Sequence, residues 1–153
     1  MPTIMRSMNV ISRCSNIYKT DKLRLDDIGG CHHAFIFTIC RNPGMSQDMI
    51  AKEICLNKST VTRTLGYLEE RGYITRKHDE KDKRSLLVYP TDKMLAILPS
   101  VRAIAAEWNE ALADGIPEDE LEIFRSVLVT MQKRAMELAV SDTDNEQSNK
   151  GAR

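Results

Sequence analysis

The stretch from Ser46 to Pro90 constrains the fold of this chain more than any other part of the sequence. It contains two short helical patterns, a glycine, and two strand-like runs separated by a charged loop. Ser46 and Asn57 are residue types that accept hydrogen bonds from the first turn of a helix, so they predict where the two helices begin. Gly72 stands where the second helix is expected to end, because glycine tolerates a left-handed backbone. The order predicts a helix-turn-helix followed by a β-hairpin.

The second predicted helix, residues 57–71, has one apolar and one polar face. Val61, Leu65 and Leu68 recur at helical spacing and predict its buried side. In a helix-turn-helix the exposed side of this helix enters the major groove of DNA. Arg63 is our candidate for reading a base, because a guanidinium can donate two parallel hydrogen bonds to guanine. Other candidates for base or phosphate contacts are Lys58, Ser59, Thr60 and Thr62, and Tyr67 is expected on the same face.

The loop of the predicted hairpin, residues 78–84, supplies a second candidate site. Lys83 and Arg84 end it, and a long cation there can enter a narrow minor groove. Asp82 is expected to orient the Arg84 guanidinium before binding. The whole chain has a formal net charge of zero, but residues 57–84 carry eight Lys and Arg against five Asp and Glu, a net +3. Residues 91–140 carry a net −4, so the basic charge is concentrated in the predicted reading region.

These stretches resemble the MarR (multiple antibiotic resistance regulator) family of winged-helix repressors. The matching segments are STVTR at 59–63, LEERGYI at 68–74 and DKR at 82–84, the last corresponding to the family's D-x-R signature. The resemblance implies a homodimer formed by intertwined N- and C-terminal helices. It also implies binding to a pseudo-palindromic operator and release by a small ligand or oxidant. The sequence YPTDKM at 89–94 departs from the family pattern at the junction after the hairpin.

The flanking regions predict further helices, so the fold class is mainly α (α+β). Residues 4–20, 31–41, 92–113 and a segment from Pro117 onward show helical patterns. We expect residues 1–41 and 91–140 to form a helical dimerisation region, 42–90 the winged helix-turn-helix module, and 141–153 a disordered tail. Apolar residues of the last helix step by three and four, as in a coiled-coil seam: they are Leu121, Phe124, Leu128, Met131, Ala135 and Leu138.

The sequence says less about a site for an effector than about the DNA-binding region. Tyr18, His32, His33 and Phe35 are candidates for lining an effector pocket, and the effector itself is not identified. A zinc site usually has about four ligands. Cys31 with the two adjacent histidines does not supply four ligands, so we expect no metal site and no cofactor. Cys14 keeps a thiol-based redox sensor open as an alternative.

Other function classes have less support. The chain has no Gly-rich phosphate loop and no nucleophile motif, so no enzymatic activity is expected. It has neither an apolar run of about 18 residues nor a secretory signal, which predicts a cytoplasmic protein. A winged-helix module that binds another protein instead of DNA remains the alternative from a different class.

Overall fold

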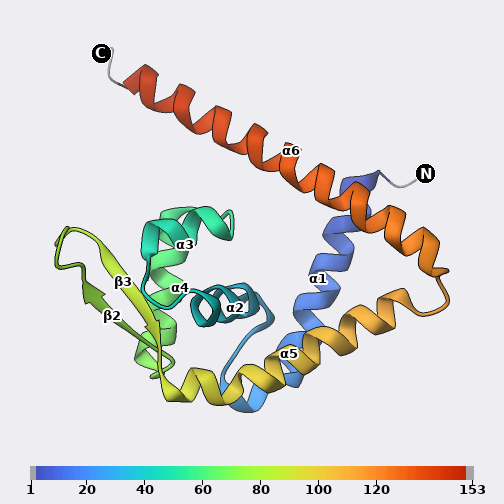
Figure 1. Cartoon of the computed structure of the whole chain (residues 1–153), viewed down its shortest axis with the longest axis horizontal. Coiled ribbons are helices and arrows are strands. Elements are labelled where there is room, and N and C mark those ends of the chain that lie inside the picture. The colour runs from blue at the N-terminus through green and yellow to red at the C-terminus, as the bar shows by residue number, and fades with distance from the viewer. Residues whose placement is uncertain (1–2, 151–153) are drawn as a thin grey trace. The chain divides into compact units, whose positions relative to one another are not determined.

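The computed structural model describes residues 3–150, without the side chains of residue 25 and residues 140–150. The chain forms two compact units that divide after Asn109. The first holds most of the secondary structure (Figure 1), and the second holds the end of α5 and all of α6. The elements are α1 (Ile4–Lys22), η1 (Arg24–Asp26), η2 (Gly30–His32), α2 (His33–Arg41), β1 (Met45–Ser46), α3 (Gln47–Glu53), α4 (Lys58–Glu70), β2 (Ile74–His78), β3 (Leu86–Pro90), α5 (Asp92–Ala113) and α6 (Glu118–Lys150).

The predicted helix boundaries in the central region are confirmed by the capping geometry. The Ser46 hydroxyl accepts the Met49 N–H at 3.2 Å at the start of α3. The Asn57 side chain accepts the Thr60 N–H at 2.8 Å at the start of α4. Gly72 follows α4 with a φ of 74°, the left-handed conformation that made glycine a stop signal.

A three-stranded antiparallel sheet completes this region, with the strand order β1-β3-β2. The predicted hairpin is present, and its loop is displaced by one residue from the predicted 78–84, since β2 ends at His78 and β3 begins at Leu86. The two-residue strand β1 was not predicted, because two residues are too few to show an alternating pattern. It pairs Met45 with Val88, next to a bond from the Gly44 N–H to the Val88 carbonyl at 2.8 Å. The helices α3 and α4 with this sheet form a winged helix-turn-helix (Figure 1).

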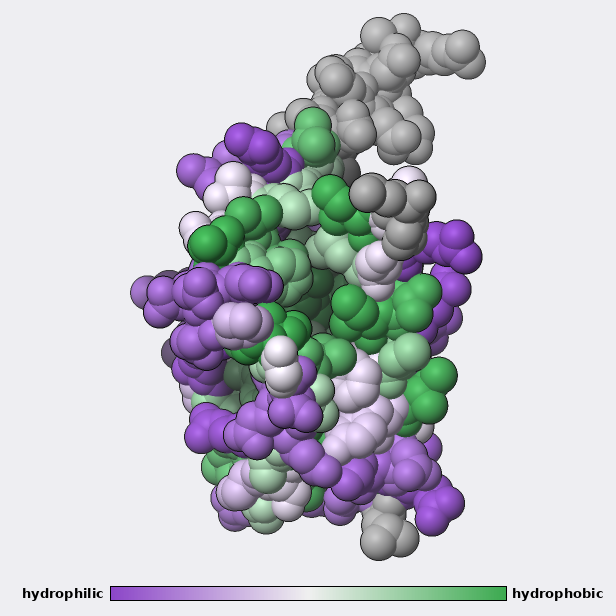
Figure 2. Space-filling model, turned by 90° about the vertical axis from the view of Figure 1, so that its right-hand side faces the viewer, coloured by the Kyte–Doolittle hydropathy of each residue, from purple (hydrophilic) through white to green (hydrophobic). Residues whose placement is uncertain are grey.

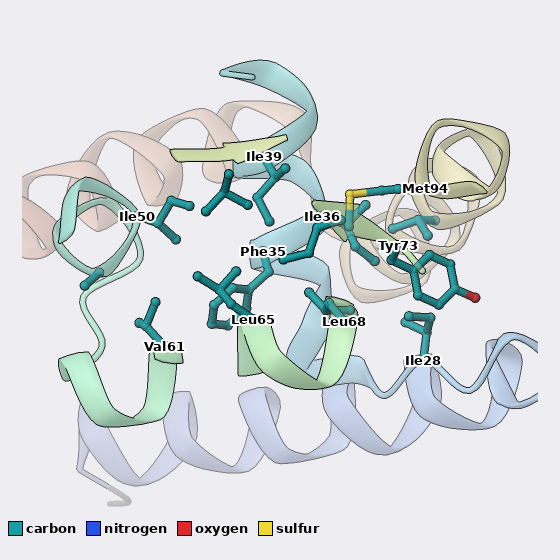
Figure 3. Close-up of a cluster of buried hydrophobic side chains, with 14 of the residues drawn as sticks. Ile28, Phe35, Ile36, Ile39, Ile50, Val61, Leu65, Leu68, Tyr73 and Met94 are labelled. Carbon is teal, nitrogen blue, oxygen red and sulfur yellow. The ribbon is translucent and has the colours of Figure 1, made fainter. Parts of the chain in front are cut away.

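One hydrophobic core supports the winged helix (Figure 3). The predicted stripe of α4, Val61, Leu65 and Leu68, is fully buried. It packs within a cluster that includes Phe35 of α2 and Met94 of α5. Each such side chain contributes roughly 1.5–3 kcal/mol by leaving water. Burial of this stripe therefore turns the opposite face of α4 to solvent. The core also joins residues on both sides of the expected boundary at 41/42, and that domain division stays a prediction.

The second unit is dominated by α6, whose first turn carries Glu118, Asp119 and Glu120. The helix continues to Lys150, past Ser141, where the sequence predicts a disordered tail; residues 151–153 lie outside the described residues. Phe124 of the predicted seam is 55% exposed in the single chain. Among the described residues, no helix is both long and apolar enough to cross a membrane.

Candidate nucleic-acid interface

The N-terminal half of α4 presents most of the predicted reading residues to solvent. Lys58, Ser59, Thr62 and Arg63 are exposed, whereas Thr60 is half-buried. Within the described part of the chain, Arg63 has no ion-pair partner. Its guanidinium is therefore available to a ligand.

Several of the neighbouring polar groups already have partners within the protein. The Ser59 hydroxyl donates to the Asn57 side-chain oxygen at 2.9 Å, so it supports the helix cap. Lys58 forms an ion pair with Asp48 of α3 at 3.1 Å, with both side chains mostly exposed. An exposed pair of this kind is worth at most about 1 kcal/mol, so a phosphate can compete for the ammonium.

Thr62 connects α4 to α3 through its hydroxyl. That hydroxyl donates to the carbonyl of Lys58, one turn earlier, at 2.9 Å. It also accepts a hydrogen bond from Nε2 of Gln47 at 2.6 Å. The sequence does not indicate this contact, because Gln47 follows a helix cap and resembles any polar residue of a first turn.

The hairpin loop is held by main-chain and side-chain hydrogen bonds, and its cations form no ion pair with any residue that the structure describes. The Asp82 carboxylate accepts the main-chain N–H of Arg84 at 3.1 Å. The Lys83 carbonyl accepts a hydrogen bond from the His78 ring at 2.8 Å, which requires the proton on Nδ1. Lys83 and Arg84 are exposed. The expected pairing of Asp82 with the Arg84 guanidinium is absent among the described residues, and the carboxylate instead shapes the loop.

Glu69 joins α4 to the hairpin. Its carboxylate accepts hydrogen bonds from Nη2 of Arg76 at 2.6 Å and from Nε at 3.0 Å. It also accepts the main-chain N–H of Arg76 at 3.2 Å. These hydrogen bonds lower the pKa of Glu69 below its ordinary value, and the nearby positive charge adds to the effect. Helix α4 and the hairpin are therefore fixed relative to each other by three hydrogen bonds between Arg76 and the Glu69 carboxylate, two of them from the charged guanidinium.

Tyr67 was expected on the reading face of α4, and that expectation is wrong. Its hydroxyl donates to the carbonyl of Asp27 at 2.7 Å. The ring of His32 stacks on it at 4.8 Å, and the Arg71 guanidinium lies 3.5 Å from its centroid. Tyr67 lies about three turns into α4, beside the segment between α1 and α2. Its hydroxyl therefore forms a hydrogen bond within the protein instead of facing a ligand.

The four residues predicted to line an effector pocket each have a separate aromatic or apolar environment. The ring of Tyr18 packs against Trp108 at 5.2 Å, and Phe35 belongs to the core. His32 accepts the Gly29 N–H at 3.0 Å and stacks on Tyr67. A shared pocket for these residues stays a prediction.

His33 is the member of this group with the least ordinary surroundings. It is 4% exposed and packs edge-on against Phe37 at 5.8 Å. Neither ring nitrogen has a hydrogen-bond partner in the described part of the molecule. Burial, with smaller effects of the charges at Lys19 and His32, lowers the pKa of His33 to about 4. The imidazole is therefore neutral at pH 7.

The cysteines do not form disulfides in the described structure. Cys14 is exposed on α1, Cys31 and Cys55 are also exposed, and Cys40 is half-buried. Among the described residues, no three His, Cys, Asp or Glu side chains lie together as a group able to hold a metal ion. Exposure gives Cys14 the solvent access that oxidation needs. Its use as a sensor stays a prediction.

The sequence of this chain is similar to those of known proteins. Residues 32–86 match the model of the MarR family. The chain is 25% identical over 133 residues to the uncharacterized HTH-type transcriptional regulator YybA of Bacillus subtilis (strain 168). That alignment covers 87% of this chain and 89% of the relative.

Solved structures agree with the sequence comparisons over nearly the whole chain. A MarR transcriptional regulator from Methanosarcina mazei Go1 has a TM-score of 0.83 at 27% identity, covering 88% of this chain and 97% of its own. A putative MarR family transcriptional regulator from Listeria monocytogenes, solved in complex with a 26mer DNA, has a TM-score of 0.86 at 20% identity. The latter similarity covers 94% of this chain and 96% of that structure, and it shows a shared fold.

Proposed function

Because this chain belongs to the MarR family of transcriptional regulators, we propose that it is a homodimeric repressor that binds a pseudo-palindromic DNA operator. The observation that supports this proposal is that α4 and the hairpin loop each present exposed cations with no ion-pair partner among the described residues. Arg63 is exposed on α4, and Lys83 with Arg84 is exposed in the hairpin loop. The contact between Glu69 and Arg76 holds α4 and β2 together.

The proposed binding mode places α4 in the major groove and the hairpin loop along the adjacent minor groove. Arg63 donates to a guanine, and Thr62 meets a neighbouring base. Lys58, Ser59 and Thr60 lie at the start of α4, where contacts to phosphate position the helix. Lys83 and Arg84 contact the backbone or the narrow groove, on a loop shaped by Asp82. The DNA complex of the Listeria structure, a protein of the same fold, supports this choice of partner.

Dimer formation is supported by apolar side chains that the single chain leaves uncovered. A soluble monomer rarely exposes large apolar patches, and those that it does expose commonly mark interfaces. Hydrophobic side chains are open to solvent in the view of Figure 2. The strongly exposed ones on α1 and α6 are Ile4, Met5, Val10, Ile17, Ile123, Phe124, Val127, Val129 and Leu138.

Release from DNA by a small-molecule effector is the last part of the proposal. Tyr18, His32, His33 and Phe35 are the candidate lining residues. The test adds small phenolic compounds, oxidants and zinc singly to the protein–DNA complex and follows dissociation. An oxidant that acts on the wild-type protein but not on Cys14→Ser favours thiol-based sensing over an effector pocket.

The main experiment selects duplexes from a random-sequence pool with the purified protein and measures their affinity by fluorescence anisotropy at several salt concentrations. We expect one preferred palindrome and a strong salt dependence. Arg63→Ala should cost about 1–3 kcal/mol and relax specificity at one base pair, whereas Arg84→Ala should weaken binding with less change of specificity. Arg24→Ala removes the same charge from η1 and should have little effect.

A different result would contradict the proposal. Binding that ignores salt and selects no sequence, with both arginine substitutions silent, contradicts DNA reading. It would favour the other class of function, a winged-helix module whose partner is a protein.

A further inference from the structure

The threonine at the centre of the reading face has a hydroxyl that the protein already uses. We propose that Thr62 reads a thymine through its methyl group, and that Gln47 is the positioning residue that holds it in this orientation. The inference rests on the proposed function, since it assigns atoms within the same DNA-reading surface.

The hydrogen-bond geometry determines what the Thr62 side chain can still offer. A hydroxyl has one proton and two lone pairs. Its proton goes to the Lys58 carbonyl at 2.9 Å, and one lone pair accepts from Nε2 of Gln47 at 2.6 Å. In this arrangement the Thr62 hydroxyl donates within the protein and not to a base. Thr62 as a residue is exposed, and its methyl group is the part of the side chain that has no hydrogen-bonding role.

The packing around Gln47 does not by itself favour an amide. Its Oε1 is buried and has no hydrogen-bond partner among the residues described. A buried, unpartnered carbonyl is unfavourable, so packing between α3 and α4 alone would favour an apolar side chain. The contact with Thr62 is the single hydrogen bond of this amide in the described structure. We infer that this contact is what the amide supplies.

The base group that matches a threonine methyl is the C5-methyl of thymine. In the major groove only thymine presents a methyl group, and a threonine methyl is one of the side-chain groups that contact it. Ser59 also uses its hydroxyl internally, toward Asn57, but it has no methyl to offer. Thr60 and Thr64 also carry a methyl group, but both are half-buried. Thr62 is therefore the exposed threonine of α4, and its chemistry favours a thymine.

The test uses the duplex selected by the wild-type protein and replaces its thymines one at a time by deoxyuridine, which lacks only the methyl. Loss of one buried methyl contact predicts about fourfold weaker binding at one thymine of each half-site. Thr62→Val keeps a methyl and should keep this discrimination. Thr62→Ser keeps the hydroxyl and should lose it.

Gln47→Met tests the positioning role, because methionine keeps the length of the side chain and removes the amide. Alone it should reduce the thymine-to-deoxyuridine ratio. Combined with Thr62→Val it should add little, since valine has one strongly preferred rotamer in a helix and needs no hydrogen bond to hold it. This non-additivity distinguishes action through Thr62 from a general loosening of α3.

Thr64→Ser is the matched control, because it deletes the same methyl from a half-buried threonine of α4. It should leave the ratio unchanged. The proposal is overturned if Thr62→Ser keeps the wild-type ratio, or if no thymine is sensitive to its methyl. The proposed function survives either result as long as a preferred duplex is bound. Failure to select any duplex overturns both.

Discussion

At the scale of single residues, the environment of His33 has the clearest energetic consequence. The residue is buried, and both ring nitrogens lack a partner in the described structure. Burial of an unpartnered polar group costs free energy, and burial of its charged form costs more. This is the physical reason that the pKa of His33 lies at about 4, well below the ordinary value of 6.5.

We predict that His33→Leu stabilises the protein, and more so at acid pH. The folded-state pKa is lower than the unfolded one, so the unfolded chain takes up the proton first as the pH falls below about 6.5. The wild type therefore loses stability between about pH 6.5 and pH 4, whereas the leucine variant lacks this loss. The difference should widen by about 1–2 kcal/mol between pH 8 and pH 5. Urea unfolding at both pH values measures it, and an equal difference would argue against the buried neutral imidazole.

Asp82 gives a second prediction at this scale. Its carboxylate accepts the Arg84 main-chain N–H, a role that an asparagine side-chain oxygen can also fill. Asp82→Asn should therefore change DNA affinity by less than about twofold. Asp82→Ala should weaken it by about fivefold, the equivalent of one hydrogen bond. If the asparagine variant is as weak as the alanine variant, the negative charge matters and orientation of the Arg84 guanidinium is the better explanation.

At the scale of elements, the reading helix and the hairpin behave as one piece because Glu69 bonds both the side chain and the main chain of Arg76. Local sequence signals place the two elements but give no sign of this contact. The Arg76 side chain is one-fifth exposed. A carboxylate that bonds a mostly covered guanidinium is worth more than an exposed pair.

We predict that Glu69→Gln destabilises the protein by about 1 kcal/mol at pH 7. The pKa of Glu69 is below its ordinary value of 4.5, so its contribution is present above about pH 4.5 and is lost as the pH falls through the lower, folded-state pKa. The difference from wild type should shrink at pH 3, as measured by urea unfolding.

Glu118→Gln serves as the control for this prediction. It removes the partner of Arg125 in an ion pair of α6 whose side chains are both more than half exposed. Its effect should stay within about 0.5 kcal/mol. A Glu69→Gln effect no larger than that of the control would mean that the contact with Arg76 does not stabilise the fold.

The elements themselves were largely predictable, because their signals are local. A cap at Asn57, a left-handed stop at Gly72 and a charged loop between two strand-like runs each depend on a few adjacent residues. The contacts between elements were not predictable. Thr62 and Gln47 are 15 residues apart, and the Tyr67 hydroxyl reaches a carbonyl 40 residues away. Such contacts follow from the packing of the helices, which no pattern in a single sequence specifies.

At the scale of the whole molecule, the apolar side chains exposed on α1 and α6 are the basis for predicting a dimer interface. Their burial in a second copy is the proposed explanation for their exposure in one chain. Phe124 belongs to the seam predicted from residues 121–138 and is 55% exposed. Substitution there should leave the fold of a single chain intact.

We predict that Phe124→Glu shifts the protein from dimer to monomer in sedimentation experiments and lowers its affinity for the selected palindrome. A charge buried at an interface without a partner is strongly unfavourable. Thr130→Glu adds the same charge to an exposed position of α6 outside the seam and should leave the dimer intact. Unchanged association of the Phe124 variant would exclude this part of α6 from the interface.

The burial of Met94 and Val101 in the same core as the apolar stripe of α4 has a mechanical consequence. The first turns of α5 cannot move without carrying the reading helix along, since a close-packed core does not deform continuously. In a dimer, a change that tilts α5 therefore alters the distance between the two copies of α4 and leaves the shape of each unchanged. Operators place their half-sites about 34 Å apart. The affinity of such a dimer for DNA then depends on how well two lengths agree. One is the distance between the two copies of α4, and the other is the half-site spacing set by the pitch of the double helix.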